Sequence, residues 1–270
     1  MRVPLLAALL AQLTAAPGLA QMYSPPAPVP RTTSAPALRE IAVRREIEER
    51  FALGLDAEAR RDWKAASLEF ERIVALHPPE PQGSTARYDL AIAYANDGRN
   101  EDAARQLRAA LALDPGFLAA MANLVSVDVA LGNILEARRI ADRYVTLAPD
   151  SARALYSRGI IALQSGDAAA AREDFGKLLH ANPSYAVAHY DLALAEERLG
   201  RYDAAERELR SALALAPAYA RARFALGVVL LREGEHAAAR NAFAQATLDA
   251  AGDPALQNIA AAMRDSIKAP

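Results

Sequence analysis

Four histidines are the side chains in this sequence best suited to acid–base or metal chemistry, and their spacing does not gather them into a site. They are His77, His180, His189 and His236. No two of them are three or four residues apart, which is the spacing that places two side chains on one face of a helix. Because a zinc site needs several ligands held together, the sequence predicts no metal site.

Nucleophiles and phosphate-binding loops are also missing from the sequence. There is no cysteine, which excludes a thiolate nucleophile, a thiolate-bound metal and a disulfide. No serine lies in a nucleophile-elbow motif, and the glycines form no phosphate-binding loop. Carboxylate pairs can always be found among 33 acidic residues, so such pairs decide nothing. We therefore expect a protein that is not an enzyme and has no cofactor.

The charge of the chain is nearly balanced, at 31 basic and 33 acidic residues. A nucleic-acid-binding domain normally carries a clear basic excess, and a protein held to an anionic membrane surface does too. Hydrophobic residues make up 53% of the chain, and alanine is prominent among them. We expect no nucleic-acid partner, and helices that pack closely through small residues.

A repeat runs through most of the chain and must position any functional residues. Pro115, Pro149, Pro183 and Pro217 are each 34 residues apart, and Pro78 precedes the first of these by 37. A fixed period of this length is typical of a solenoid, in which each supersecondary unit buries its apolar face against its neighbours. The sequence therefore predicts a chain of stacked units rather than one closed globular core.

The residues inside each period resemble the tetratricopeptide repeat, a pair of antiparallel helices. The leucine–glycine pair of the first helix corresponds to Leu53-Gly54, Leu90-Ala91, Leu124-Val125, Arg158-Gly159, Leu192-Ala193 and Leu226-Gly227. The turn glycines are Gly98, Gly132, Gly166, Gly200 and Gly234, and the small residues of the second helix are Ala66, Ala103, Ala137, Ala171, Ala205 and Ala239. The bulky residue four positions later is Phe70, Leu107, Phe175, Leu209 or Phe243, with Ala141 as the weak case. The departures, Arg61 for the first turn glycine and Ala251 for the last proline, fall in terminal repeats, where irregularity is expected.

This resemblance implies an all-α fold, a right-handed α-solenoid of about six helix–turn–helix repeats with a C-terminal capping helix. We place the solenoid at residues 38–251, with repeats near 47–80, 84–117, 118–151, 152–185, 186–219 and 220–251. We place the capping helix at residues 252–270, with Asp253 as its N-cap and Pro254 in its first turn. Its apolar face is predicted to consist of Leu256, Ile259, Met263 and Ile267.

The N-terminal residues are typical of an export signal followed by a linker. Residues 1–20 contain Arg2, a short apolar run and small residues at Gly18 and Ala20, which predicts cleavage before Gln21. The apolar run is shorter than the roughly 20 residues that a membrane span needs, so no transmembrane segment is expected after cleavage. Residues 21–37 contain five prolines and read as an extended spacer, with a proline-rich partner site as the alternative.

The family resemblance implies that the first helices of the repeats line a concave groove that receives a partner segment. The groove positions carry aromatic residues at the fifth place of several repeats and aliphatic residues at the ninth. The candidate groove residues are Tyr88, Tyr156, Ile160, Tyr190, Leu194, Phe224 and Val228. Tyrosine at the fifth place also packs between repeats in this family, so the aromatic row fits a binding surface and a packing surface equally well.

Arginines concentrate toward the C-terminal end of this groove. They are Arg153, Arg198, Arg221 and Arg232. Such a cluster can hold an acidic segment or a chain-terminal carboxylate, although arginines that only face solvent would give the same pattern. We expect the partner to be a protein or peptide segment, and an acidic group on it would complement these arginines.

The function expected from these features is a non-catalytic scaffold or adaptor for protein–protein interaction in the cell envelope. The expected location is the periplasm, or otherwise an exported position, because of residues 1–20. The alternatives are a tetratricopeptide component of an envelope secretion or polysaccharide-export assembly, and an accessory subunit of an envelope enzyme.

Overall fold

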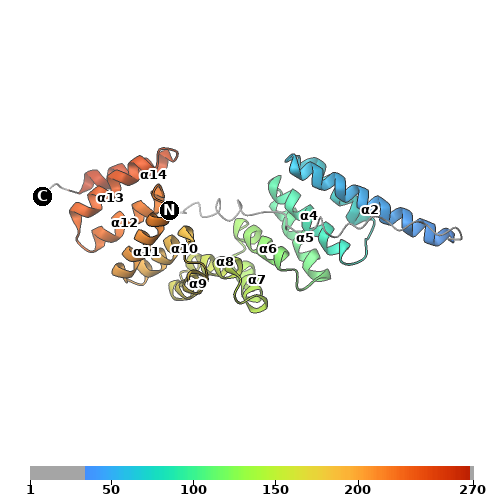
Figure 1. Cartoon of the computed structure of the whole chain (residues 1–270), viewed down its shortest axis with the longest axis horizontal. Helices are drawn as coiled ribbons and strands as arrows, with labels where there is room; N and C mark the ends of the chain where they lie inside the picture. The colour runs from blue at the N-terminus through green and yellow to red at the C-terminus, as the bar shows by residue number, and fades with distance from the viewer. Residues whose placement is uncertain (1–33, 268–270) are drawn as a thin grey trace. The chain divides into compact units, whose positions relative to one another are not determined.

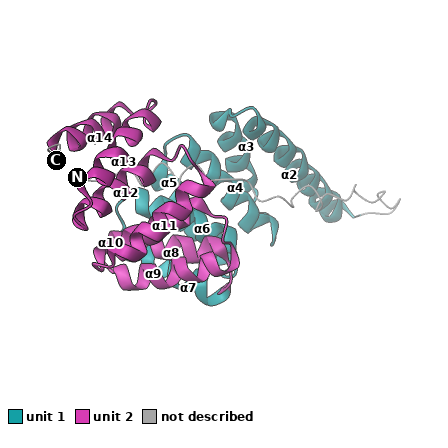
Figure 2. Ribbon diagram, turned by 60° about the vertical axis from the view of Figure 1, so that its left-hand side comes forward, with its two compact units in different colours: residues 1–147 teal, residues 148–270 magenta. Residues whose placement is uncertain are grey.

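The computed structural model describes residues 34–267, and these residues form thirteen helices with no strand among them. The chain divides into two compact units, unit 1 at residues 1–147 and unit 2 at residues 148–270, which Figure 2 distinguishes by colour. Each unit contains three helix pairs, and unit 2 has one further helix at its end. The predicted all-α class and its paired helices are confirmed. The predicted export signal and most of the predicted linker lie outside the described residues.

Unit 1 consists of helices that each pack on the next one along the chain (Figure 1). They are α2 (Ala35–Ala59), α3 (Trp63–Ala75), α4 (Gln82–Asn96), α5 (Asn100–Leu113), α6 (Leu118–Ala130) and α7 (Ile134–Leu147). In this unit the helices α2, α4 and α6 are the first members of their pairs.

Unit 2 continues the same alternation. Its helices are α8 (Ala152–Gln164), α9 (Ala168–Ala181), α10 (Ala186–Arg198), α11 (Tyr202–Leu215), α12 (Ala220–Arg232), α13 (His236–Asp249) and α14 (Pro254–Ser266). The first helices α8, α10 and α12 also contact one another in sequence, α10 lying between the other two. These three helices therefore present one shared face.

The turns inside the pairs depend on a left-handed backbone conformation. The five predicted turn glycines all have φ between 73° and 83°, a region that glycine enters without the steric cost of a Cβ atom. Arg61, which stands where the first turn glycine would be, adopts the same region with φ 59°. The first repeat therefore keeps the geometry of the turn although it lacks the glycine.

Helix pairs are held together by a match in size between one residue of the first helix and one of the second. Three glycines face phenylalanine rings so closely that an added Cβ atom would lie 2.6 or 2.7 Å from a ring carbon. These pairs are Gly54 with Phe70, Gly159 with Phe175, and Gly227 with Phe243. Two other pairs have alanine on the first helix and leucine on the second, namely Ala91 with Leu107 and Ala193 with Leu209. The remaining pair has Val125 on the first helix and Ala141 on the second. The departures from the leucine–glycine motif thus compensate one another in volume.

Arg158 replaces the leucine of that motif and is explained by a charged partner on the second helix. Its guanidinium donates two hydrogen bonds to the carboxylate of Asp174, at 2.8 and 2.6 Å. The Asp174 side chain is only 2% exposed. A buried carboxylate that has a two-pronged arginine partner is stable, so the pair α8–α9 replaces one apolar contact by an ion pair.

The two ends of the helical region differ in detail from the sequence expectations. Helix α2 begins at Ala35 rather than Leu38, because Pro36 falls in the first turn, where a helix does not need its missing N–H. The helix therefore extends 12 residues before Ile47, which is more than three turns.

Helix α14 caps the last pair, but one predicted contact was wrong. Asp253 accepts a hydrogen bond from the Leu256 amide at 3.1 Å, as an N-cap does. Ile267 and Met263 pack on the core around Phe243. Ile259 is 38% exposed, whereas Ala260 is fully buried. One residue turns a helix by about 100°, so the close approach of α14 at the small Ala260 points Ile259 toward solvent.

Candidate partner-binding surface

The face shared by α8, α10 and α12 carries a row of apolar side chains that solvent partly reaches. On α10 these are Tyr190 and Leu194, and on α12 they are Phe224 and Val228, all of them half-buried. Residues four apart lie above one another on a helix, so each helix contributes an aromatic and an aliphatic side chain to the same face. We refer to these four residues as the apolar row.

The two predicted groove residues on α8 are buried beneath this face. Ile160 is 1% exposed and Tyr156 is 5% exposed. The Tyr156 hydroxyl donates a hydrogen bond to the Asp191 carboxylate of α10 at 2.9 Å. Tyr156 therefore joins neighbouring repeats, Ile160 is buried, and the surface available to a partner lies on α10 and α12.

Tyr88, the candidate in unit 1, is equally buried at 1% exposure. Its hydroxyl accepts a hydrogen bond from the Asn123 side-chain amide at 3.0 Å, and its ring lies 4.9 Å from that of Phe117. The same geometry therefore occurs twice: a tyrosine at the fifth place of one repeat bonds the polar side chain at the sixth place of the next. We call this contact the tyrosine link.

Tyr190 occupies the fifth place of its repeat but cannot make a tyrosine link. The sixth place of the next repeat is Ala225, which has no hydrogen-bonding side chain. Burial raises the pKa of the Tyr190 phenol to about 12, and the negative charge of Asp191 adds to this effect. The ring rests against Tyr219 with centroids 5.2 Å apart. Tyr190 is thus a neutral, half-buried ring that packs on Tyr219.

The predicted arginine cluster is spread over different environments. Arg198 donates to the Leu163 carbonyl near the end of α8, and Arg221 lies 4.0 Å from the Asp253 carboxylate at the start of α14. Arg232 is exposed at the end of α12, and Arg153 is half-buried near the start of α8. The structure does not gather the four guanidinium groups around one point, so they act at most as separate positive charges along the face.

Asp191 is the one strongly perturbed acid of this face. Burial raises its pKa to about 7, and the hydrogen bond from Tyr156 partly opposes this shift. The carboxyl has no metal ligands around it, since the described residues contain no cluster of three or more potential ligands. His189, the histidine nearest in sequence, contacts Glu208 at 2.6 Å and the Pro183 carbonyl at 3.0 Å. These contacts fix α10 against its neighbours and suit a structural role.

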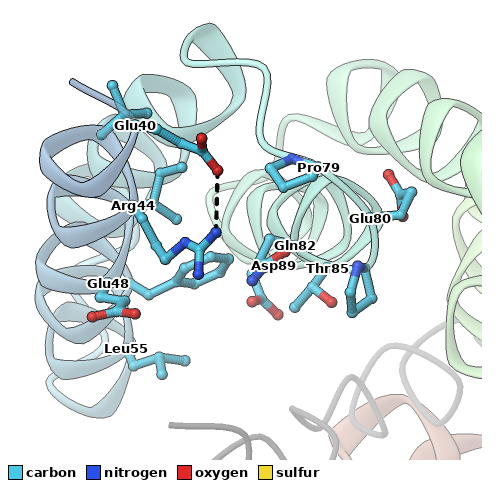
Figure 3. Close-up of a pocket in the computed structure, with 13 residues that line it drawn as sticks. Glu40, Arg44, Glu48, Leu55, Pro79, Glu80, Gln82, Thr85 and Asp89 are labelled. Carbon is cyan, nitrogen blue, oxygen red and sulfur yellow. Dashed lines mark hydrogen bonds and ion pairs between the residues drawn. The ribbon is translucent and has the colours of Figure 1, made fainter. Parts of the chain in front are cut away.

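A second candidate surface, which the sequence did not predict, is a pocket of about 480 Å³ in unit 1. It lies between one face of α2 and the start of α4, with the Pro79–Pro81 turn at its edge (Figure 3). Figure 3 shows Asp89 on the α4 side and Glu48 and Leu55 across from it on α2. The sequence signal for this pocket is Phe51 at the fifth place of the first repeat, because phenylalanine cannot form a tyrosine link with Asp89 in the second repeat.

Two family models for the tetratricopeptide repeat match this chain. One covers residues 51–116, 123–186 and 190–254, and the other covers residues 162–214. Together these matches span well over half of the sequence. The chain belongs to the tetratricopeptide repeat family. Members of this family are typically non-catalytic scaffolds, and membership supports a role in protein–protein interaction.

Solved structures share the fold at low sequence identity. A tetratricopeptide repeat protein from Parabacteroides merdae is 19% identical with a TM-score of 0.66, over 82% of this chain and 98% of that one. MamA from Desulfovibrio magneticus is 19% identical with a TM-score of 0.60, over 64% and 97%. The Cut9–Hcn1 hetero-tetramer of the APC/C contains a chain that is 20% identical with a TM-score of 0.64, over 83% and 43%. No functionally curated protein matches the sequence.

Proposed function

We propose that this protein is a non-catalytic adaptor of the cell envelope that holds an extended partner segment on the face formed by α10 and α12. The observation that carries the proposal is the apolar row, in which Tyr190, Leu194, Phe224 and Val228 are only half-buried. Large apolar side chains that gather on one face of a soluble domain mark an interaction surface more often than single exposed ones do.

The aromatic members of the row are suited to act as anchors. Tyr190 packs on Tyr219, and Phe224 packs on Phe243 with ring centroids 5.3 Å apart. Because these rings are already fixed by packing, a partner that contacts them loses little side-chain entropy from the protein. The Tyr190 hydroxyl adds a polar point of contact, since Ala225 offers it no acceptor. Tyrosine and arginine are enriched among residues that dominate binding energy.

Arginines at the margin of this face favour a partner with negative charge. The Arg221 side chain is 37% exposed and lies 4.0 Å from the Asp253 carboxylate. An exposed ion pair at this distance contributes little to stability. A carboxylate on the partner can therefore compete for this guanidinium. Peripheral charges of this kind act mainly on the rate of association.

The envelope location is supported by residues 1–20, which have the charged start, apolar run and small residues of a secretory signal. Among the described residues, none of the helices is both long and apolar enough to cross a membrane. N-terminal sequencing of the protein from an envelope fraction is expected to begin at Gln21. Recovery of protein that still begins at Met1 from the cytoplasm would contradict the export proposal.

The binding face can be tested by site-specific photo-crosslinking in the cell. A benzophenone amino acid is placed at Leu194 or Val228, and at Leu248 as the control, a 67% exposed leucine on the second helix α13. We expect one common adduct from the first two positions and not from Leu248. Adducts formed at Leu248 but not at Leu194 or Val228 would refute the proposed face.

A further inference from the structure

The pocket in unit 1 is lined by described residues of α2, α4 and the turn between α3 and α4. Its α2 wall is formed by Ile47, Phe51 and Leu55, which repeat at four-residue spacing. Its opposite wall is formed by Thr85 and Asp89 of α4. The α2 side also carries the charged Glu40, Arg44 and Glu48, and the cavity between α2 and α4 has a volume of about 480 Å³. Figure 3 shows this lining with the chain in front cut away.

A tyrosine link is missing at this point of the repeat array. In the later repeats the hydroxyls of Tyr88 and Tyr156 bond Asn123 and Asp191, each 35 residues further along. The equivalent of Asp191 in the second repeat is Asp89, and the fifth place of the preceding repeat is Phe51. A phenylalanine ring has no hydroxyl, so Phe51 cannot make with Asp89 the hydrogen bond that Tyr156 makes with Asp191.

Asp89 is left with an unsatisfied carboxylate oxygen as a result. The residue is 1% exposed, and its Oδ2 atom has no hydrogen-bond partner. An unpaired buried acceptor is costly because it has lost water without gaining a donor. Asp89 also lines the pocket, so its carboxyl group lies beside the space that a donor could occupy.

The carboxyl group of Glu58 lies close enough to Asp89 for their charges to interact. The Oε1 atom of Glu58 is also buried without a partner. Burial raises the pKa of Glu58 to about 7. Burial also holds the pKa of Asp89 well above its ordinary value, and the charge of Glu58 raises it further. Both groups would be stabilised as carboxylates by a positive charge between the helices.

The lining of the pocket has a net negative charge. Glu48, Glu80 and Asp89 line it together with the pair of Arg44 and Glu40, whose charged atoms are 3.4 Å apart. That pair sits toward the open side, because both its side chains are more than half exposed. The described residues around it offer no group of three or more ligands for a metal ion. The apolar wall suits a ligand that has a hydrocarbon stem behind its charge.

We infer that this pocket receives a lysine or arginine side chain of a partner protein segment, with the cationic group donating to Asp89 and the stem lying against Phe51 and Leu55. The inference extends the proposed function to unit 1, because it names a chemical group on the partner. It rests on the proposed function in one respect, namely that the ligand belongs to a protein segment. Charge-assisted hydrogen bonds to a buried carboxylate are among the stronger polar contacts in proteins.

The pocket can be tested alone with small probes that copy the side chain. The probes are n-butylammonium, which matches the lysine stem and charge, and 1-butanol, its neutral counterpart. Titrations followed by NMR amide shifts should show saturable changes at Thr85, Asp89 and Phe51 with n-butylammonium. Binding of 1-butanol should be at least about tenfold weaker, because it lacks the charge. Equal binding of the two probes, or no binding of n-butylammonium, would overturn the inference. Neither result would bear on the apolar row of unit 2, because the probes report on the pocket of unit 1.

Two variants separate the pocket from general stability. Phe51→Tyr should restore the tyrosine link to Asp89, raise the melting temperature and weaken n-butylammonium binding by about tenfold or more. Asp89→Asn should weaken binding similarly by removing the charge. Glu101→Gln makes the same kind of charge change at an exposed site on α5 and should leave binding unchanged. A folded, stabilised Phe51→Tyr protein that binds n-butylammonium as tightly as the wild type would refute the role of Asp89.

Discussion

Gly159 gives the sharpest test of how the helix pairs are packed. A methyl group at this position would lie 2.7 Å from the Cε1 atom of Phe175. Favourable carbon–carbon contacts lie at about 3.5 to 4.0 Å, so the ring would have to move by roughly 1 Å. Phe175 is fully buried and has no exposed side toward which to move. Gly159→Ala should therefore strain the α8–α9 pair.

The expected loss follows from two opposing terms. Forcing an extra methyl group into a packed core costs about 1–3 kcal/mol. Replacing glycine by alanine inside a helix returns about 1 kcal/mol. Gly176→Ala is the matched control, because it lies in the interior of α9 and an added Cβ atom would meet nothing within 4 Å. The control should gain stability, and the difference between the two variants should equal the steric cost.

Urea unfolding followed by circular dichroism measures both variants. The double change Gly159→Ala with Phe175→Leu recreates the combination found naturally at Ala193 and Leu209. We expect the double variant to be more stable than the sum of the single changes predicts, since the two residues are in direct contact. Equal stabilisation by Gly159→Ala and Gly176→Ala would show that the ring does not require the glycine.

Three other predictions concern stability. Burial raises the pKa of Asp191 to about 7, so the folded state binds a proton that the unfolded chain releases near pH 4. The free energy of unfolding should therefore fall as pH rises from about 4 to about 7, and Asp191→Asn should flatten this part of a pH series of melts. Arg158→Leu restores the family residue but should cost about 3 kcal/mol in urea unfolding, because it leaves the buried Asp174 without its partner; a further Asp174→Leu change should recover most of that loss. Ending the chain at Ala251 should lower the melting temperature and the solubility, since it uncovers the apolar surface beneath Ile267, and an unchanged melt would refute the capping role.

The periodic features of the fold could be predicted from the sequence because each repeat imposes the same local physics. The turn glycines need positive φ, and the small alanines such as Ala171 and Ala205 are fully buried where the helices cross. Six copies in register make these local requirements visible. The ends of the array have no second copy for comparison. We therefore expected α2 to begin three residues later than it does, and we expected Ile259 to face the core, although it faces solvent.

The candidate site was less predictable because its residues are defined by contacts between repeats. Tyr156 and Tyr190 occupy the same place in their repeats, yet Tyr156 is buried and Tyr190 is partly open. The difference follows from the next repeat, which offers Asp191 to the first tyrosine and Ala225 to the second. The pocket beside Asp89 arises in the same way from Phe51. Reading each fifth-place residue together with the sixth place of the following repeat would have identified both.

The central claim, that a partner lies on the apolar row, is tested most directly by affinity. The partner identified by crosslinking is titrated against the wild type, Tyr190→Ala, and the double variant Tyr190→Ala with Phe224→Ala, with Leu248→Ala as the exposed-leucine control and circular dichroism to confirm folding. We predict that Tyr190→Ala weakens binding by about 1–3 kcal/mol, in the range of residues that dominate interfaces, that the double variant binds more weakly still, and that the control is unchanged. Full affinity in a folded double variant would contradict the account and place the partner on another surface of the protein.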